Sequence, residues 1–375
     1  MNFGFTDEQD LLRAEARRFL DQNCPLEQVR KLAETPEGFS RDLWARMAEL
    51  GWVGLVVPES FGGAGLGWVD LVVVLEEIGR SLFPSPLIAT VLTAKAIETA
   101  GSEAQQQRWL PGLADGSVIG SFALFEASDR IDPAGIALAG EPDGDGVRLR
   151  GEKLFVFDAG AADLFAVAFR SGPEPEAVSL ALVEAESEGL EVEMLTTMDE
   201  TKRQGRLRFD GVRVALADLL GAPGSAGPAI AQLVNCGAAA VTAEAIGAAE
   251  AALDLTVRYA KQRVQFGAPI GRFQAVKHPL AEMYVDIESF KSLLYYAAWA
   301  VDEAPEEAPL AVSRAKAYAS EAFARIGIDA VQLHGGIGYT WEYDAQLYLK
   351  RAKWARPAFG DPDTHYDRVA KLGGW

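Results

Sequence analysis

Apolar residues recur at helical spacing through the first part of the chain. A helix is predicted after Thr6, which can cap it with Gln9 at the capping-box position. A second helix is expected around Leu43 and to end at Gly51, since glycine commonly follows a helix C-terminus. Further helical patterns cover residues 69–80, 87–100 and 105–113. Residues 1–117 are therefore expected to form an α-helical domain.

Short apolar runs separated by turns replace this pattern from about residue 118 to 222. Asp143-Gly144 and Asp145-Gly146 are hairpin signals. The runs that read as strands include residues 164–169, 178–183 and 207–214. No helical pattern separates them, so an antiparallel barrel or sandwich is expected and a parallel nucleotide-binding sheet is not.

Helical spacing returns after Pro223 and continues toward the C-terminus. The expected helices cover residues 229–259, 282–299, 309–333 and 343–354. The sequence thus predicts an α+β protein with three parts: an N-terminal helical domain (1–117), a middle β domain (118–222) and a C-terminal four-helix bundle (223–375).

Composition and charge narrow the classes of partner. The chain has 375 residues, 49% of them hydrophobic and 24% charged, which is an ordinary globular balance. The formal net charge of −19 argues against nucleic acid or an anionic membrane as a partner, because clustered Lys and Arg hold such partners. Two cysteines, no signal-like N-terminal segment and no apolar run of about 20 residues predict a cytoplasmic protein.

Two segments carry the residue types that hold phosphates. The first is Arg263-Val264-Gln265-Phe266-Gly267-Ala268-Pro269-Ile270, followed by Phe273 and Gln274; a guanidinium fork is well shaped for a pyrophosphate. An arginine near a helix C-terminus can also simply favour the helix dipole. The second segment is Gln332-Leu333-His334-Gly335-Gly336, whose glycines let backbone approach a phosphate closely or merely connect two helices.

These two segments resemble the signatures of the acyl-CoA dehydrogenase family, and the order of helical, β and helical regions is similar over nearly the whole chain. The resemblance implies that both segments bind the ADP half of the FAD of an adjacent subunit. The residues that it assigns to the cofactor are Arg263, Gln265, Phe266, Gln274, Gln332, Gly335 and Gly336. His334 is expected to be a packed or hydrogen-bonding residue, and with only three histidines no metal site is expected.

The chain departs from the family where a catalytic carboxylate is needed. Members usually carry a Glu-Gly-Thr motif after the last Arg-x-Ala-Lys helix, and the glutamate removes the α-proton of the substrate. Here Phe359-Gly360 stands in the Glu-Gly place, followed by Asp361. Other members place the glutamate at the start of the long helix after the barrel, where this chain has Asn235-Cys236-Gly237-Ala238 and no acid.

The contacts expected around the flavin ring are altered too. The family's Thr-Glu-Pro-x-x-Gly-Ser-Asp loop is shortened to residues 125–129, and its Lys-x-Trp-Ile-Thr-Asn strand reads Lys153-Leu154-Phe155-Val156-Phe157-Asp158. Phe157 lacks the hydroxyl that would bond the flavin. Asp361 stands where a threonine would face the phosphate-bearing side of the cofactor, and a carboxylate there is repulsive unless it is paired.

Three hypotheses follow. The first is a non-catalytic subunit that completes the FAD site of a homologous catalytic subunit, in a heterotetramer similar to the bacterial enzymes of steroid side-chain oxidation. That complex would dehydrogenate an acyl-CoA thioester and pass electrons to an electron-transfer flavoprotein. The second is a complete homomeric enzyme with Asp361 or Asp363 as base, although Asp-Pro-Asp-Thr also reads as a turn and helix cap. The third is a flavin-free scaffold or acyl-CoA-binding module.

Overall fold

The computed structural model describes residues 5–375. Residues 1–4, the start of the segment in which no signal-like pattern was found, lie outside this range. The chain divides into two compact units, and neither is continuous in sequence. The first comprises residues up to Lys31, Trp68–Phe83 and Ala238–Trp375; the second comprises Leu32–Gly67 and Pro84–Gly237. These units interleave along the chain, whereas the expected domains are consecutive, so the boundaries 1–117, 118–222 and 223–375 stay a prediction.

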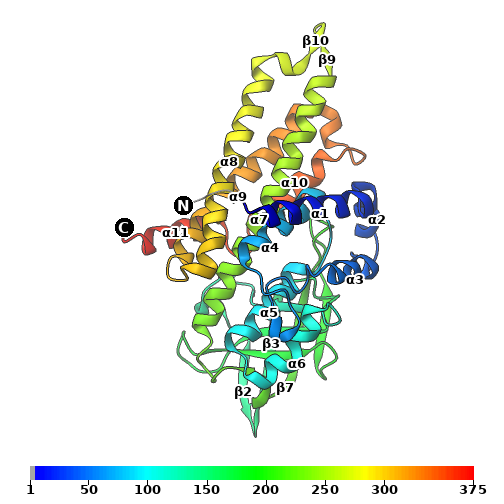
Figure 1. Ribbon diagram of the computed structural model, residues 1–375. Coiled ribbons are helices and arrows are strands. Elements are labelled where there is room, and N and C mark those ends of the chain that lie inside the picture. The colour runs from blue at the N-terminus through cyan, green and yellow to red at the C-terminus, as the bar shows by residue number, and fades with distance from the viewer. Residues whose placement is uncertain (1–4) are drawn as a thin grey trace. The chain divides into compact units, whose positions relative to one another are not determined.

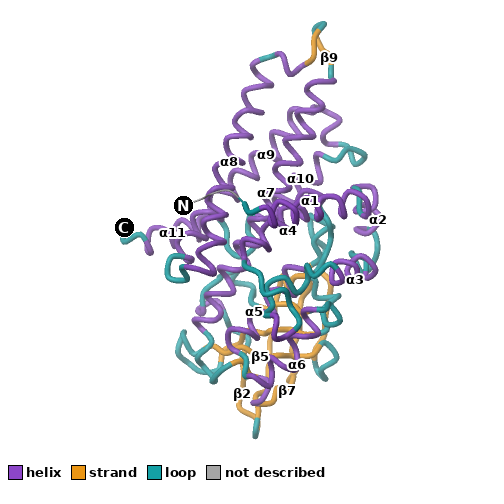
Figure 2. Tube along the Cα trace, viewed as in Figure 1, coloured by secondary structure: helices purple, strands orange, loops and turns teal. Residues whose placement is uncertain are grey.

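The first unit is helical (Figures 1 and 2). It contains α1 (Asp7–Asn23), most of α2 (Leu26–Ala33), α4 (Trp68–Ser81), most of α7 (Gly227–Gln262), α8 (Gln274–Glu303), α9 (Ala308–His334), α10 (Ala345–Ala355) and α11 (Pro362–Leu372). Thr6 and Gln9 form the predicted capping box of α1. The short helix α2 was not anticipated from the sequence, whereas α11 begins where Asp-Pro-Asp-Thr reads as a helix cap.

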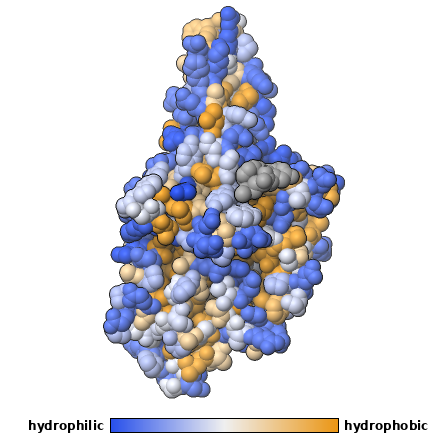
Figure 3. Space-filling model, turned by 60° about the vertical axis from the view of Figure 1, so that its left-hand side comes forward, coloured by the Kyte–Doolittle hydropathy of each residue, from blue (hydrophilic) through white to orange (hydrophobic). Residues whose placement is uncertain are grey.

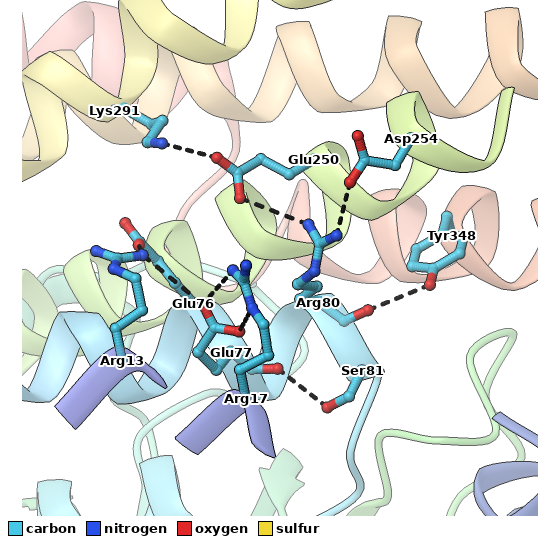
Figure 4. Close-up of polar contacts among 10 residues, drawn as sticks. All are labelled: Arg13, Arg17, Glu76, Glu77, Arg80, Ser81, Glu250, Asp254, Lys291 and Tyr348. Carbon is cyan, nitrogen blue, oxygen red and sulfur yellow. Dashed lines mark hydrogen bonds and ion pairs between the residues drawn. The ribbon is translucent and has the colours of Figure 1, made fainter. Parts of the chain in front are cut away.

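Charged residues join α1 to its neighbours in this unit (Figure 4). Arg17 of α1 donates twice to the buried carboxylate of Glu77 in α4, over 2.8 and 2.7 Å, and Arg13 pairs with Glu76. A second set of pairs links α4 and α8 to α7: Arg80 with Asp254 and Lys291 with Glu250. Buried carboxylates need such partners, so the network fixes how these four helices pack.

Helix α4 crosses α7 at two glycines. A Cβ atom added at Gly79 would lie 2.0 Å from the carbonyl oxygen of Glu244, and one added at Gly247 would lie 1.7 Å from that of Glu76. No side chain fits at either position, so the backbones approach directly. The alanine- and glycine-rich composition of α7 therefore reflects close packing.

The second unit is built on a mostly antiparallel sheet, as predicted. Its path runs β6-β7-β3-β2-β4-β5-β8, with β1 paired in parallel to β4. The strands are β1 (Gly120–Ala123), β2 (Ala139–Asp143), β3 (Gly146–Phe157), β4 (Leu164–Arg170), β5 (Val178–Glu184), β6 (Leu190–Met194), β7 (Gln204–Ala215) and β8 (Leu219–Leu220). The hairpin between β2 and β3 lies where the Asp-Gly pairs predicted it. The helices of this unit are α3 (Arg41–Glu49), α5 (Leu87–Ala100) and α6 (Glu103–Ala114).

Helix α7 is long and apolar enough to cross a membrane by length and composition, but 83% of its most apolar window is buried inside the protein. A buried core helix has the same composition as a membrane span. The face drawn in Figure 3 mixes hydrophilic and hydrophobic residues. The apolar character of α7 is therefore explained by its position in the protein core.

Candidate functional site

The two segments with phosphate-binding residue types, 263–270 and 332–336, are called the first and second phosphate-type segments. The first forms a projecting hairpin between two long helices. Helix α7 ends at Gln262, and β9 (Val264–Gln265) pairs with β10 (Ala268–Pro269) before α8 begins at Gln274. Phe266 and Gly267 make the two-residue turn, both with positive φ (52° and 75°), the geometry of a tight hairpin. Figure 1 shows β9 and β10 at the end of α7 and α8.

The side chains assigned to the cofactor on this hairpin are exposed and uncommitted. Phe266 is 94% exposed and makes an edge contact with Phe273, with ring centroids 6.0 Å apart. The side chains of Arg263, Gln265 and Gln274 are exposed, and they make no hydrogen bond or ion pair with any residue among 5–375. These side chains are suited to binding a group outside their own chain, because a guanidinium, two amides and an aromatic ring are all accessible there.

The second segment lies where α9 ends. Gly335 follows His334 with φ 64°, and Gly335–Tyr339 forms a 3₁₀ turn. A Cβ added at Gly335 or Gly336 would meet nothing within 4 Å, whereas one added at Gly338 would meet the carbonyl of Val331 at 2.6 Å. Gly338 is therefore required by packing. Gly335 and Gly336 instead present open backbone that a phosphate can approach.

The structure brings the two segments together through aromatic rings. Tyr259, in the last turns of α7, lies against His334 with ring centroids 4.5 Å apart. These residues are far apart in sequence, and this contact was not anticipated. The residue types that suit the ADP half of a dinucleotide thus gather at one end of the helical unit, and they fit such a ligand.

The place of the family's glutamate holds no acid in this chain. Phe359 is 2% exposed, with φ 56°, and Gly360 follows with φ 102°. Asp361 caps α11 by accepting from the backbone N–H of Thr364 over 2.8 Å, as the helix-cap interpretation predicts. That backbone bond and the nearby Arg356 and Lys316 keep the pKa of Asp361 below its ordinary value although burial opposes them. Asp363 is exposed in the first turn of α11.

Two buried side chains fix the loop that contains Phe359. Lys316 of α9 donates to the carbonyl oxygens of Ala355, Arg356 and Gly360 over 3.0, 2.9 and 3.1 Å. Burial lowers the pKa of Lys316 to about 7. His365 of α11 is also buried, and its Nε2 lies 2.9 Å from the carbonyl oxygen of Phe359. Sequence reasoning missed both residues; a lysine inside an alanine-rich apolar run was the available signal.

The segments expected near the flavin ring contain a buried ion pair, in the other unit. Lys153 on β3 is fully buried and donates to Glu126 over 2.6 Å and to the carbonyl of Leu124 over 3.0 Å. Burial lowers the pKa of Lys153 to about 8, against the effect of Glu126. The same carboxylate accepts from the backbone of Ala137 and Leu138. This pair therefore shapes the shortened loop, and Phe157 occupies its predicted strand position with a buried ring.

Comparison with known proteins identifies the family. Residues 6–117 match the model of the acyl-CoA dehydrogenase N-terminal domain, and residues 228–373 match that of the C-terminal domain. The chain is 34% identical over 367 residues to acyl-CoA dehydrogenase IpdE2 of Mycolicibacterium smegmatis, covering 97% of this chain and 98% of that protein.

Solved structures agree in fold over the full length. A complex of ChsE4 and ChsE5 from Mycobacterium tuberculosis matches with a TM-score of 0.91 and 30% identity, covering 100% of this chain and 99% of the other. A variant of the steroid acyl-CoA dehydrogenase Tcur3481–Tcur3483 matches with a TM-score of 0.88 and 32% identity, covering 98% of both chains. The chain therefore belongs to the acyl-CoA dehydrogenases, the family of FAD-dependent oxidoreductases that its two phosphate-type segments indicated.

Proposed function

We propose that this chain is the FAD-completing, non-catalytic subunit of a heteromeric acyl-CoA dehydrogenase. The observation that carries the proposal is a contrast within one chain. The side chains suited to the ADP half of FAD are present, exposed and uncommitted, whereas a buried phenyl ring occupies the place of the proton-removing carboxylate. A phenyl ring cannot accept a proton, so this position cannot remove the α-proton, and we assign that step to another chain.

The division of labour follows from this contrast. Arg263 and the amides of Gln265, Gln274 and Gln332 hold the pyrophosphate and adenosine of the cofactor, and Gly335-Gly336 provides backbone that approaches closely. A homologous catalytic subunit provides the carboxylate and the contacts to the flavin ring. FAD, when bound, accepts the hydride from the β-carbon of an acyl-CoA thioester. An electron-transfer flavoprotein is the proposed electron acceptor and the cytoplasm the proposed compartment.

Two similar structures support a heteromeric assembly. The ChsE4–ChsE5 complex and the steroid enzyme Tcur3481–Tcur3483 each carry two subunit names. By analogy, a steroid-derived acyl group is the proposed substrate class, which rests on likeness of fold and family alone.

The test is the flavin content of the protein. The chain is expressed alone and then together with the product of a neighbouring gene, and flavin absorbance is measured per chain. The proposal predicts no flavin in the chain alone and about one FAD per two chains in the complex. About one FAD per chain in the protein alone would instead support a homomeric enzyme, and Asp361→Ala and Asp363→Ala would then be tested for loss of turnover. No flavin in either preparation would support a scaffold or acyl-CoA-binding role.

A further inference from the structure

Three aromatic rings join the ends of the two phosphate-type segments. The ring of His334 lies between those of Tyr259 and Tyr343, with centroids 4.5 and 4.8 Å away. Tyr259 and Tyr343 are themselves in edge contact, with centroids 6.2 Å apart. Tyr259 belongs to α7, His334 ends α9, and Tyr343 precedes α10. The cluster therefore ties three segments of the helical unit together at one place.

The orientation of the central ring is fixed by its own helix. His334 is 3% exposed, and its Nδ1 lies 2.6 Å from the carbonyl oxygen of Ala330, so Nδ1 carries the hydrogen and donates it. Its Nε2 is buried without a hydrogen-bond partner in the described part of the chain. Burial lowers the pKa of His334, which keeps the imidazole neutral at neutral pH. Because the ring is neutral, its burial against the two tyrosines does not carry the desolvation cost of a charged group.

The cluster is linked through the backbone to each cofactor-facing group, by one hydrogen bond on one side and one peptide bond on the other. The backbone N–H of Arg263 donates to the carbonyl oxygen of Tyr259 over 2.8 Å, so a shift of Tyr259 moves the base of the arginine. On the other side, His334 is bonded directly to Gly335, where the backbone turns with positive φ. The packing of Tyr259 on His334 therefore sets the separation between the backbone of Arg263 and the glycine turn.

We propose that Tyr259, His334 and Tyr343 form an aromatic clamp that holds Arg263 and Gly335-Gly336 at the separation needed to contact one ADP group. This inference rests on the proposed function of the two segments. The three residues are positioning residues, because they act through the arginine and the glycine turn. Hydrogen bonds to phosphate tolerate only a few tenths of an ångström in length, so the separation decides whether both contacts form together.

The experiment measures FAD affinity in the flavin-loaded assembly, whether the second chain is a homologous subunit or another copy of this one. His334→Leu and Tyr259→Leu are expected to weaken FAD binding about 10- to 100-fold, because an error of about 1 Å in placement is that costly. Competition by ADP should weaken in parallel, while the flavin absorption maximum stays unchanged. Tyr259→Phe keeps the ring and should restore affinity to within about twofold of wild type.

A double-mutant cycle separates the clamp from general loss of structure. If the clamp acts through Arg263, then His334→Leu should weaken FAD binding much less in an Arg263→Ala background than in the wild type. Phe290→Leu replaces a fully buried aromatic ring in α8, a helix that contributes no residue to the cluster, and is the matched control. It should lower the midpoint of urea unfolding without changing FAD affinity in native buffer.

The outcomes distinguish the clamp from the proposed function. If Arg263→Ala weakens FAD binding but His334→Leu and Tyr259→Leu do not, or if the effects are additive, the clamp is wrong and the proposed function stands. If none of the three changes FAD affinity, both are wrong. If a leucine variant fails to fold, Tyr259→Phe and Tyr343→Leu decide: the first keeps its ring and should bind FAD like the wild type, the second removes the third ring and should weaken FAD binding, and equal affinities contradict the clamp.

Discussion

The guanidinium of Arg263 is the clearest single group in the candidate site, because it is exposed and has no partner within residues 5–375. Arg263→Ala should weaken FAD binding to the assembled enzyme about 10- to 100-fold, since a hydrogen bond to a charged group is worth about 1.5–3 kcal/mol. Arg272→Ala is the matched control, because Arg272 is an exposed arginine on the segment that follows the hairpin. Equal effects of the two substitutions on FAD fluorescence titrations would mean that only net charge matters.

The buried imidazole of His365 should make the free energy of unfolding depend on pH. Burial, with a smaller contribution from Lys316, lowers its pKa to about 3, and Arg368 and Asp361 also face it. The unfolded chain therefore binds a proton that the folded chain does not, and stability falls as pH drops from about 6.5 toward 3, by up to about 4–5 kcal/mol. His365→Gln retains a donor for the carbonyl of Phe359 and should flatten this slope in urea unfolding at several pH values. An unchanged slope would show that His365 does not titrate in that range.

At the scale of helices and strands, hydrophobic periodicity predicted the position of an element well where a helix spans several turns or where a strand forms a distinct apolar run. The structure places β4, β5 and β7 on the predicted runs and gives α5 the predicted bounds, Leu87–Ala100. The helix expected at 282–299 is longer, Gln274–Glu303; Pro279 lies inside it, and a proline in a sequence usually indicates a helix boundary. The short helix α2 was missed, because its eight residues are fewer than the window in which helical periodicity is read, and only the cap of α11 was recognised.

Helix α10 is joined to α7 by a fully buried ion pair. Arg351 donates to Glu244 over 3.1 Å, with both side chains excluded from solvent. Arg351→Met should lower the free energy of unfolding by about 3–5 kcal/mol, because it removes the cation that faces a buried carboxylate. The double variant Arg351→Met/Glu244→Leu should be less destabilised than the sum of its single changes. Additive losses in urea unfolding would show that the two side chains do not act as a pair.

At the scale of the whole molecule, exposed apolar side chains on α8 indicate an assembly. Tyr284, Val285 and Trp299 are 57%, 61% and 41% exposed, and all lie on this one helix. We predict that this face of α8 takes part in the assembly, because large exposed apolar side chains are typical of association surfaces. Val285→Arg should dissociate the flavin-loaded assembly in light scattering, because it places an uncompensated charge in the interface. Leu216→Arg changes a similarly exposed residue of the β-containing unit and should leave the molar mass unchanged.

The sequence by itself determined the family, the order of helical and β regions, and which residue types are present or missing at the cofactor and base positions. These follow from local spacing and from motifs that are contiguous in the chain. Only the tertiary structure decided that Tyr259, His334 and Tyr343 meet, that Lys316 and His365 fix the loop around Phe359, and that Glu126 pairs with Lys153. Such contacts join residues distant in sequence, and they depend on burial and packing that no local pattern encodes.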